Sequence, residues 1–384
     1  MAKTIYLDYA AATPLDSNVL AEMQPYMTDA FYNPSAPYQP AREVRKDIEE
    51  ARISVARIIG AKPTEVVFTA GATESINLAF NIGGHMVTTT TEHAAVLQAA
   101  NTHDATLVNV DEKGRVNPND IKKAITPKTT IVTVSFVNNE TGTIQDLKSI
   151  AKIIFDERQK REAKGSTTPL YLHTDASQAA GMLDIHVARL GVDMMTLNGG
   201  KIYGPKQTGI LYFNSSIDLQ PMIVGGGQER GLRSGTENVA GVIGFSKALE
   251  IAEKKRKTEF ERLENLRQQM LDILQKEFTD IIIIGDQKHH TPHILTAAWR
   301  GLDAERVLFA LESQNILVAT GSACAANKDT RSHVLTALGL EPGIIDASLR
   351  FSFGRHTTSD DVDTAAKIIV DVIKQELARG KRIK

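Results

Sequence analysis

One lysine, Lys201, stands in a setting that suits covalent chemistry. It lies in the glycine-containing segment 196–206, directly after the apolar, strand-like run 192–195. A lysine placed there can reach into a cleft where it is poorly solvated, and desolvation favours the neutral, nucleophilic form of an amine. Lys201 is therefore a candidate to form a Schiff base with a carbonyl compound.

A carboxylate, Asp175, ends another apolar strand in the segment 173–178. A lysine paired with a strand-end carboxylate suggests pyridoxal 5'-phosphate (PLP), because the PLP aldehyde needs an amine and its pyridine nitrogen needs an acidic partner. Taken singly, Lys201 could be a surface lysine beside a turn and Asp175 a helix cap. Together, and with a phosphate-binding turn, they favour the cofactor.

A candidate phosphate-binding turn, residues 70–73, separates a strand at 66–69 from a helix that starts near residue 74. The small residues here, Ala72 and Thr73, would let backbone N–H groups approach an anion at the positive end of the helix. Simple helix capping explains the same pattern. A glycine-rich basic loop, residues 225–238, is a candidate for a second anion contact, although such loops often provide only flexibility.

Strands and helices alternate along most of the chain, which predicts an α/β fold with a mostly parallel sheet flanked by helices. The expected strands include 86–90, 107–110, 131–137 and 170–174, and the expected helices include 42–59, 92–101 and 146–164. Ligands bind beyond the carboxyl ends of such strands. Four polar residues should converge there: His93, Asn139, Asp175 and Lys201. His93 could instead cap a helix, and Asn139 could shape the turn 138–142.

The length of 384 residues exceeds what one hydrophobic core usually fills. We expect a large PLP-binding domain over 15–255 and a smaller α/β domain built from 1–14 and 256–384. A polar helix over 239–277 should link the two.

The net charge of −2 argues against broad electrostatic binding to nucleic acid, and the basic run 254–257 fits a solvated helix face. No stretch has the length and apolarity of a membrane span, and the first residues lack a signal sequence. A single cysteine cannot form an internal disulfide. We expect a cytoplasmic protein without a metal site, a membrane partner or a direct nucleic-acid partner.

The single cysteine, Cys324, lies in a small, polar segment without helix or strand periodicity. A typical free cysteine is a buried small hydrophobe, yet this segment offers nothing to bury it. We predict a mobile loop, about 321–332, that lets the thiol travel. Arg350 lies in an apolar strand, where its guanidinium could hold a carboxylate through two hydrogen bonds.

Nearly the whole chain resembles the cysteine desulfurases, which belong to the aminotransferase class V group within PLP fold type I. The resemblance rests on ten ordered segments: 6–11, 33–35, 71–75, 91–93, 138–142, 175–178, 201–206, 233–238, 321–324 and 350–352. Each segment alone is weak, but the ordered set is specific. The long segment after Cys324 resembles the corresponding loop in the branch of the family that serves iron–sulfur assembly.

The resemblance implies a role for each matching residue. Lys201 would hold the cofactor and move the proton, Asp175 would pair with the pyridine nitrogen, and His93 would stack on the ring. The remaining contacts would be Asn139 and Gln178 at the ring hydroxyl, Ala72, Thr73, Asn198, Gly200 and Thr236 at the phosphate, and Asn33 and Arg350 at the substrate carboxylate. In the family, the threonine at the position of Thr236 comes from the neighbouring subunit, so the resemblance implies a homodimer.

The chain also departs from the family pattern. Asn198 and Gly200 stand where the family usually has serine and histidine, so Asn198 can still donate to phosphate but Gly200 offers only a backbone N–H. Tyr38 replaces a usual histidine, and the segment 158–168 is longer than is typical. These differences concern the phosphate contacts rather than the reaction.

The function implied by the resemblance is conversion of L-cysteine to L-alanine, with the sulfur captured as a persulfide on Cys324. The persulfide would pass to acceptor proteins for iron–sulfur cluster assembly, with tRNA thiolation as a second destination. Two alternatives stay open. One is another fold type I enzyme, an aminotransferase or a selenocysteine lyase, in which Cys324 is incidental. The other is a catalytically silent scaffold for sulfur transfer, which Gly200 makes conceivable.

Overall fold

A seven-stranded sheet forms the centre of the larger part of the molecule in the computed structural model, which describes residues 3–321 and 331–383. In spatial order its strands are β2 (Val66–Thr69), β8 (Gly209–Phe213), β7 (Met194–Asn198), β6 (Tyr171–Asp175), β5 (Thr129–Thr133), β3 (His85–Thr89) and β4 (Ala105–Val108). Only β8 runs antiparallel to its neighbours. The predicted mostly parallel sheet is confirmed.

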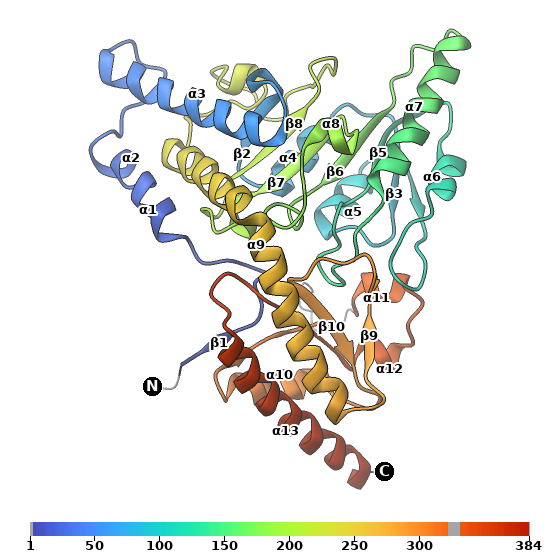
Figure 1. Cartoon of the computed structure of the whole chain (residues 1–384). Coiled ribbons are helices and arrows are strands. Elements are labelled where there is room, and N and C mark those ends of the chain that lie inside the picture. Colours follow the sequence, from blue (N-terminus) through green and yellow to red (C-terminus); the bar gives the residue numbers. More distant parts are fainter. Residues whose placement is uncertain (1–2, 322–330, 384) are drawn as a thin grey trace.

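Helices cover both faces of this sheet (Figure 1). The flanking helices are α3 (Gln39–Ile59), α4 (Ala72–Phe80), α5 (Ala94–Ala100), α6 (Pro118–Ala124), α7 (Leu147–Ala163) and α8 (Val187–Leu190). Alternate side chains of a strand point to opposite faces. Met195 accordingly packs in one core with α3 and α7, whereas Met194 packs in another with α4 and α5.

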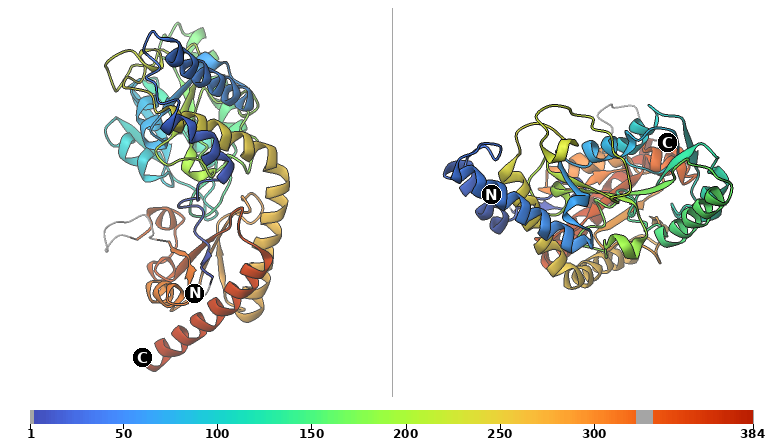
Figure 2. Two further views of the ribbon diagram at one scale, coloured as in Figure 1. Left: turned by 90° about the vertical axis from the view of Figure 1, so that its left-hand side faces the viewer. Right: turned by 90° about the horizontal axis from the view of Figure 1, so that it is seen from above.

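A 39-residue helix, α9 (Val239–Glu277), runs alongside both parts of the molecule (Figure 2, left). Its buried side chains up to Ala252 belong to the core of the large sheet, and those from Leu263 onward belong to the core of the smaller part. Two short N-terminal helices, α1 (Ser17–Met23) and α2 (Pro25–Thr28), pack on its first half. The helix passes through residues 255 and 256 without a break, so the domain boundary stays a prediction.

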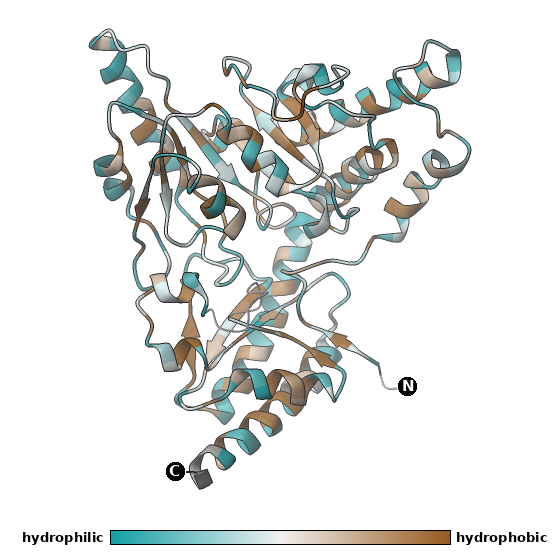
Figure 3. Cartoon of the chain, turned by 180° about the vertical axis from the view of Figure 1, so that it is seen from behind, coloured by the Kyte–Doolittle hydropathy of each residue, from teal (hydrophilic) through white to brown (hydrophobic). Residues whose placement is uncertain are grey.

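The smaller part is built on a four-stranded antiparallel sheet in the order β12 (Ala319–Thr320), β13 (Ser348–Ser352), β10 (Ile294–Ala298) and β9 (Ile282–Ile284). Its helices are α10 (Ala304–Glu312), α11 (His333–Ala337), α12 (Pro342–Ile345) and α13 (Ser359–Ile383). Apolar residues line one side of α13, as Figure 3 shows, and they pack in this core together with α10.

The N-terminal segment joins the smaller part, because β1 (Ile5–Tyr6) pairs in parallel with β11 (Ile316–Leu317). Residues 316–320 thus form two short strands with different partners, since β12 pairs with β13. Three short 3-10 turns complete the described structure: Pro63–Glu65, Glu229–Gly231 and Gly199–Lys201. The last of these positions the candidate lysine.

Candidate active site

Lys201 lies at the carboxyl edge of the large sheet, in the tight turn that follows β7. The turn needs glycine, because a Cβ atom at Gly199 would lie 2.3 Å from the Thr208 hydroxyl oxygen. The Lys201 Nζ atom donates to the carbonyl oxygens of Ala10 and Ala11, at 2.8 and 2.7 Å. The N-terminal segment thus runs directly past the amine.

Asp175 and His93 come to the same edge from β6 and from the start of α5. The Asp175 Oδ1 atom accepts from the Ser177 backbone N–H at 2.9 Å. His93 caps α5, since its Nδ1 atom accepts from the Ala95 N–H at 3.1 Å, so the alternative interpretation of this histidine as a helix cap also holds.

The pKa of His93 depends on the charged groups around it. Its side chain is exposed at the site, yet enough protein surrounds the ring that desolvation is the main cause that lowers its pKa. The Asp175 carboxylate raises that pKa, whereas Lys201 and His333 lower it. The net direction is downward, which favours a neutral imidazole at neutral pH. Three of the four residues expected to converge therefore interact at one edge.

Asn139 and Arg350 are joined through the backbone. Arg350 is 3% exposed; its Nη1 donates to the Asn139 carbonyl oxygen at 3.0 Å and its Nη2 to Asp8 Oδ1 at 2.7 Å. Its Nε is buried and has no hydrogen-bond partner among the described residues. In the turn 138–142, which Asn139 could have shaped instead, it is Asn138 whose Oδ1 accepts from the N–H groups of Glu140 and Thr141.

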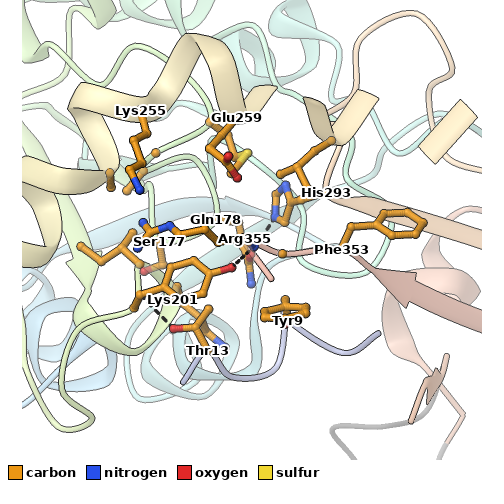
Figure 4. A pocket seen from close by; sticks show the side chains of 18 residues that line it. Tyr9, Thr13, Ser177, Gln178, Lys201, Lys255, Glu259, His293, Phe353 and Arg355 are labelled. Atoms are coloured by element: carbon orange, nitrogen blue, oxygen red, sulfur yellow. Dashed lines mark hydrogen bonds between the residues drawn. The ribbon is translucent and has the colours of Figure 1, made fainter. Parts of the chain in front are cut away.

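Gln178 follows β6 and lies beside Lys201 in a cavity of about 40 Å³ that extends toward α9 (Figure 4). Its Nε2 donates to the Ala10 carbonyl oxygen at 3.0 Å, and its Oε1 lies 3.1 Å from His293 Nε2. His293 and Arg355 also line this cavity, and sequence reasoning singled out neither.

The candidate phosphate turn opens α4, whose first residues are Ala72 and Thr73. Gly71 caps the helix with a φ of 119°, a backbone conformation that favours glycine. The Glu74 carboxylate accepts from the Ala70 N–H at 3.0 Å and forms an ion pair with Arg233 at 2.9 Å. The glycine-rich loop is thereby fastened to the start of α4.

The structure does not show a phosphate-binding role for the remaining candidates, Asn198, Gly200 and Thr236. The Asn198 Oδ1 atom accepts from the Gly200 N–H at 3.0 Å, so the one donor that Gly200 offers is occupied and the Asn198 amide nitrogen is left to donate. Thr236 is exposed and lines a cavity of about 260 Å³ with Ala70 and Arg233 of its own chain. The phosphate roles of all three residues, and a contribution from a neighbouring subunit, stay predictions.

The two residues predicted to hold the substrate carboxylate, Asn33 and Arg350, come from different parts of the molecule. Asn33 is exposed in the connection between α2 and α3, where its Oδ1 accepts from the Ser35 N–H at 2.9 Å. Arg350 lies on β13 in the other part of the molecule (Figure 1), and within the described residues no hydrogen bond joins it to Asn33. Cys324 and most of the predicted loop 321–332 lie outside the described residues.

A buried carboxylate, Glu92, was missed from the sequence although it adjoins His93. Desolvation raises its pKa to about 7, against hydrogen bonds from Ser135 and from the Thr89 hydroxyl. Its backbone carbonyl oxygen lies 2.9 Å from His333 Nε2, which must carry the proton because a carbonyl only accepts.

A second buried carboxylate, Glu140, accepts from the Ser332 hydroxyl at 2.5 Å. Ser332 caps α11, which also carries His333. The backbone carbonyl of Glu92 and the carboxylate of Glu140 thus hold the start of α11 against the site. No periodicity in the sequence indicates this contact.

Two kinds of feature are lacking in the described part of the chain. Over residues 3–321 and 331–383, no helix is long and apolar enough to cross a membrane. The same residues contain no group of three or more histidine, cysteine, aspartate or glutamate side chains arranged to hold a metal ion.

Comparison with known proteins identifies the group to which this arrangement belongs. Residues 5–364 match the aminotransferase class V family. The chain is 36% identical over 388 residues to the cysteine desulfurase IscS of Dictyoglomus turgidum, and the match covers 98% of this chain and 96% of that relative. The chain belongs to the cysteine desulfurase family.

Solved structures of related proteins have the same fold. A NifS-like protein superposes with a TM-score of 0.87 at 30% identity, covering 97% of this chain and all of the other. A structure described as SspA in complex with cysteine superposes with a TM-score of 0.78 at 32% identity, covering 92% and 100%. The predicted PLP fold type I is confirmed by this likeness.

The residues of this desulfurase-family chain fit the cofactor that the family uses. The amine of Lys201 and the strand-end carboxylate of Asp175 match the two reactive parts of PLP. The start of α4 and the Asn198 amide match its phosphate, because a helix N-terminus and amide N–H groups are donors for anions. All of these groups lie at or shortly after the carboxyl ends of β2, β6 and β7.

Proposed function

We propose that this chain is a PLP-dependent cysteine desulfurase that converts L-cysteine to L-alanine and captures the sulfur as a persulfide on Cys324. The observation that supports this most is the meeting of Lys201, Asp175 and His93 at one sheet edge. Membership in the cysteine desulfurase family indicates which reaction these three residues would carry out.

The cofactor, when bound, supplies an electron-withdrawing ring that makes the α-proton of cysteine acidic. Lys201 would hold the cofactor through its amine and, once released, accept the α-proton. Asp175 would keep the pyridine nitrogen protonated. His93, held neutral because burial lowers its pKa, would pack on the ring without adding a positive charge.

Arg350 would bind the carboxylate of the substrate. Its Nε–H has no hydrogen-bond partner among the described residues, although Asp8 and the Asn139 carbonyl already engage its other nitrogens. A carboxylate placed there would satisfy a buried donor that otherwise costs free energy.

Cys324 would act as the sulfur acceptor. Its thiolate attacks the substrate sulfur, and an S–S bond forms while the C–S bond of cysteine breaks. The electron pair of the broken bond stays with the carbon fragment, which takes up a proton and leaves as L-alanine. The outer sulfur of the persulfide is then available to an iron–sulfur scaffold or to a protein of tRNA thiolation.

A homodimer in the cytoplasm completes the proposal. Apolar side chains are exposed in the connection between α2 and α3, at Phe31, and before the glycine-rich loop, at Met222 and Val224. The two regions adjoin, because Ser35 and Gly226 line one cavity. Burying such side chains against a second copy would stabilise an assembly in which Thr236 reaches the neighbouring site.

The test is a product analysis with L-cysteine, PLP and a thiol reductant. The proposal predicts equal amounts of L-alanine and sulfide, and no keto acid. A keto acid product would indicate an aminotransferase, and purified protein that never takes up the coloured cofactor would indicate a silent scaffold. The Cys324→Ala variant should keep the cofactor absorbance and form no persulfide; sustained sulfide release by this variant would contradict the role of Cys324.

A further inference from the structure

The side chain of Gln178 connects three separate parts of the chain. Gln178 follows β6 in the large sheet; its Nε2 donates to the carbonyl oxygen of Ala10, in the N-terminal segment, at 3.0 Å. Its Oε1 lies 3.1 Å from Nε2 of His293, which directly precedes β10 in the smaller part. Figure 4 shows Gln178 and His293 side by side at the edge of the cavity that Lys201 also lines.

The hydrogen-bond directions in this chain of contacts are fixed by its ends. A carbonyl oxygen only accepts, so the Gln178 atom near Ala10 is the amide nitrogen. The atom near His293 is then the amide oxygen, which also only accepts, so His293 Nε2 must carry a proton. His293 is 7% exposed, and burial first and Arg350 second lower its pKa to about 3. The ring is therefore neutral, with the proton on Nε2.

The same carbonyl oxygen links Gln178 to the candidate lysine. The Ala10 oxygen accepts from Gln178 Nε2 at 3.0 Å and from Lys201 Nζ at 2.8 Å. A carbonyl oxygen has two lone pairs, so these two donors fill its capacity. The orientation of the Gln178 amide therefore determines whether the Ala10 oxygen, which accepts from Lys201, also accepts from Gln178.

The cavity beside these residues contains buried polar atoms without a protein partner. Ser177 and His293 both line it, and neither the Ser177 hydroxyl nor His293 Nδ1 makes a hydrogen bond with any described residue. A volume of about 40 Å³ is enough for an ordered water molecule. A water there would accept from the serine hydroxyl or donate to the free nitrogen of the ring, which would hold the ring in one orientation.

We propose that His293 is a positioning residue for the desulfurase reaction, which holds the Gln178 amide in one orientation by donating to its oxygen. With one amide N–H on Ala10, the second N–H is left for the ring hydroxyl of the cofactor. This contact with the cofactor rests on the proposed function. His293 comes from the part of the chain that carries Cys324, so it ties that part to the cofactor side of the site.

A pair of variants separates positioning from mere packing. His293→Met fills a similar volume without a donor, whereas His293→Gln keeps an amide N–H at a similar reach. Loss of the donor should leave the Gln178 oxygen unpaired and let the amide turn. The control is His173→Met, which removes a fully buried neutral imidazole that hydrogen-bonds to Thr133 and Thr196 and packs edge-on against Phe80.

The measurement is a pH titration of the visible absorbance of the Lys201-bound cofactor, without substrate. We expect His293→Met to move the midpoint by about half to one pH unit, as loss of one hydrogen bond would. His293→Gln and His173→Met should titrate like the wild type. A wild-type midpoint in His293→Met, or an equal shift in both His293 variants, would overturn the inference.

A second measurement does not depend on any variant carrying cofactor. Nitrogen NMR of histidine-labelled wild-type protein should show the His293 ring neutral and protonated on Nε2 at pH 6, with the signal assigned by its loss in His293→Gln. A charged ring, or a proton on Nδ1, would overturn the inference. A wild type that binds cofactor and makes no persulfide would refute the proposed function and leave these outcomes readable.

Discussion

Lys201 and Gln178 donate to one and the same acceptor, the carbonyl oxygen of Ala10, at 2.8 and 3.0 Å. The N-terminal segment therefore lies directly against the candidate lysine. To hold an aldehyde cofactor, the amine must give up its contacts with Ala10 and Ala11. The Lys201 amine thus has two states: it contacts the two backbone oxygens, or it binds the cofactor.

The first prediction concerns the attachment of the cofactor. Lys201→Ala should lose both turnover and covalent attachment, because no other amine takes its place at the end of β7. The measurement is borohydride reduction followed by peptide mass mapping. The matched control is Lys206→Ala, since Lys206 Nζ donates to the Thr13 carbonyl oxygen at 2.8 Å, and attachment should survive. A labelled peptide in Lys201→Ala would refute the assignment.

The second prediction concerns the grip on the substrate carboxylate. Arg350→Lys should raise KM for L-cysteine about ten- to a hundredfold, because a lysine has no donor at the position of the buried Nε–H. Steady-state kinetics and the cofactor spectrum together check this, since the spectrum should stay unchanged. Arg355→Lys is the control: Arg355 pairs with Asp16 and lies over the Tyr203 ring, and its replacement should leave KM within about twofold. An unchanged KM in Arg350→Lys would contradict the role.

The third prediction concerns pH and stability. Burial raises the pKa of Glu92 to about 7, above its ordinary value of 4.5, so its stabilising contribution is complete below pH 4.5 and is lost as the pH rises toward 7. The unfolding free energy of the wild type relative to Glu92→Gln should fall by about 3 kcal/mol over that range. Denaturant unfolding at both pH values measures this.

The control for that prediction is Glu65→Gln. Burial tends to raise the pKa of Glu65, but hydrogen bonds from the backbone N–H groups of Lys62 and Ser215 outweigh it and lower the pKa. Its contribution is therefore present above pH 4.5 and is lost as the pH falls, which is the opposite sign. If the relative stability of Glu92→Gln were the same at both pH values, the buried carboxylate would not titrate as described.

The fourth prediction concerns assembly. Val224 is 77% exposed, and Val224→Asp should weaken the proposed dimer, because a charge would be buried in the interface. Sedimentation equilibrium should show a dimeric wild type and dissociation of the variant at micromolar concentration. Phe309 on α10 is 66% exposed and serves as the control, since Phe309→Asp should remain dimeric. A monomeric wild type would refute the proposed assembly.

The carboxyl-edge part of the site could be predicted from sequence because its residues follow strands directly. His93, Asp175 and Lys201 each come within a few residues of a β-strand end, and parallel strands bring such ends together. The strand β5 ends earlier than expected, at Thr133, although the chain beyond it still contacts β6: the Phe136 N–H donates to the Asp175 carbonyl oxygen.

Contacts between distant segments could not be predicted in the same way. Nothing local in the sequence relates His293 to Gln178, or Ser332 to Glu140, because each pair is joined only by the docking of the two parts of the molecule. The strand β8 was also missed, since a run of four apolar residues shortly after the turn at 206–207 has no distinctive period. The raised pKa of the buried Glu92 side chain depends on packing that one sequence does not specify.

The central claim is that the single cysteine collects sulfur from a cofactor held by Lys201. Its most direct test is the intact mass, followed by peptide mapping, of the cofactor-loaded protein after a short incubation with L-cysteine. We predict one added sulfur atom on the peptide that contains Cys324, and no addition in Lys201→Ala. An unmodified Cys324 peptide, with L-alanine produced all the same, would contradict the account.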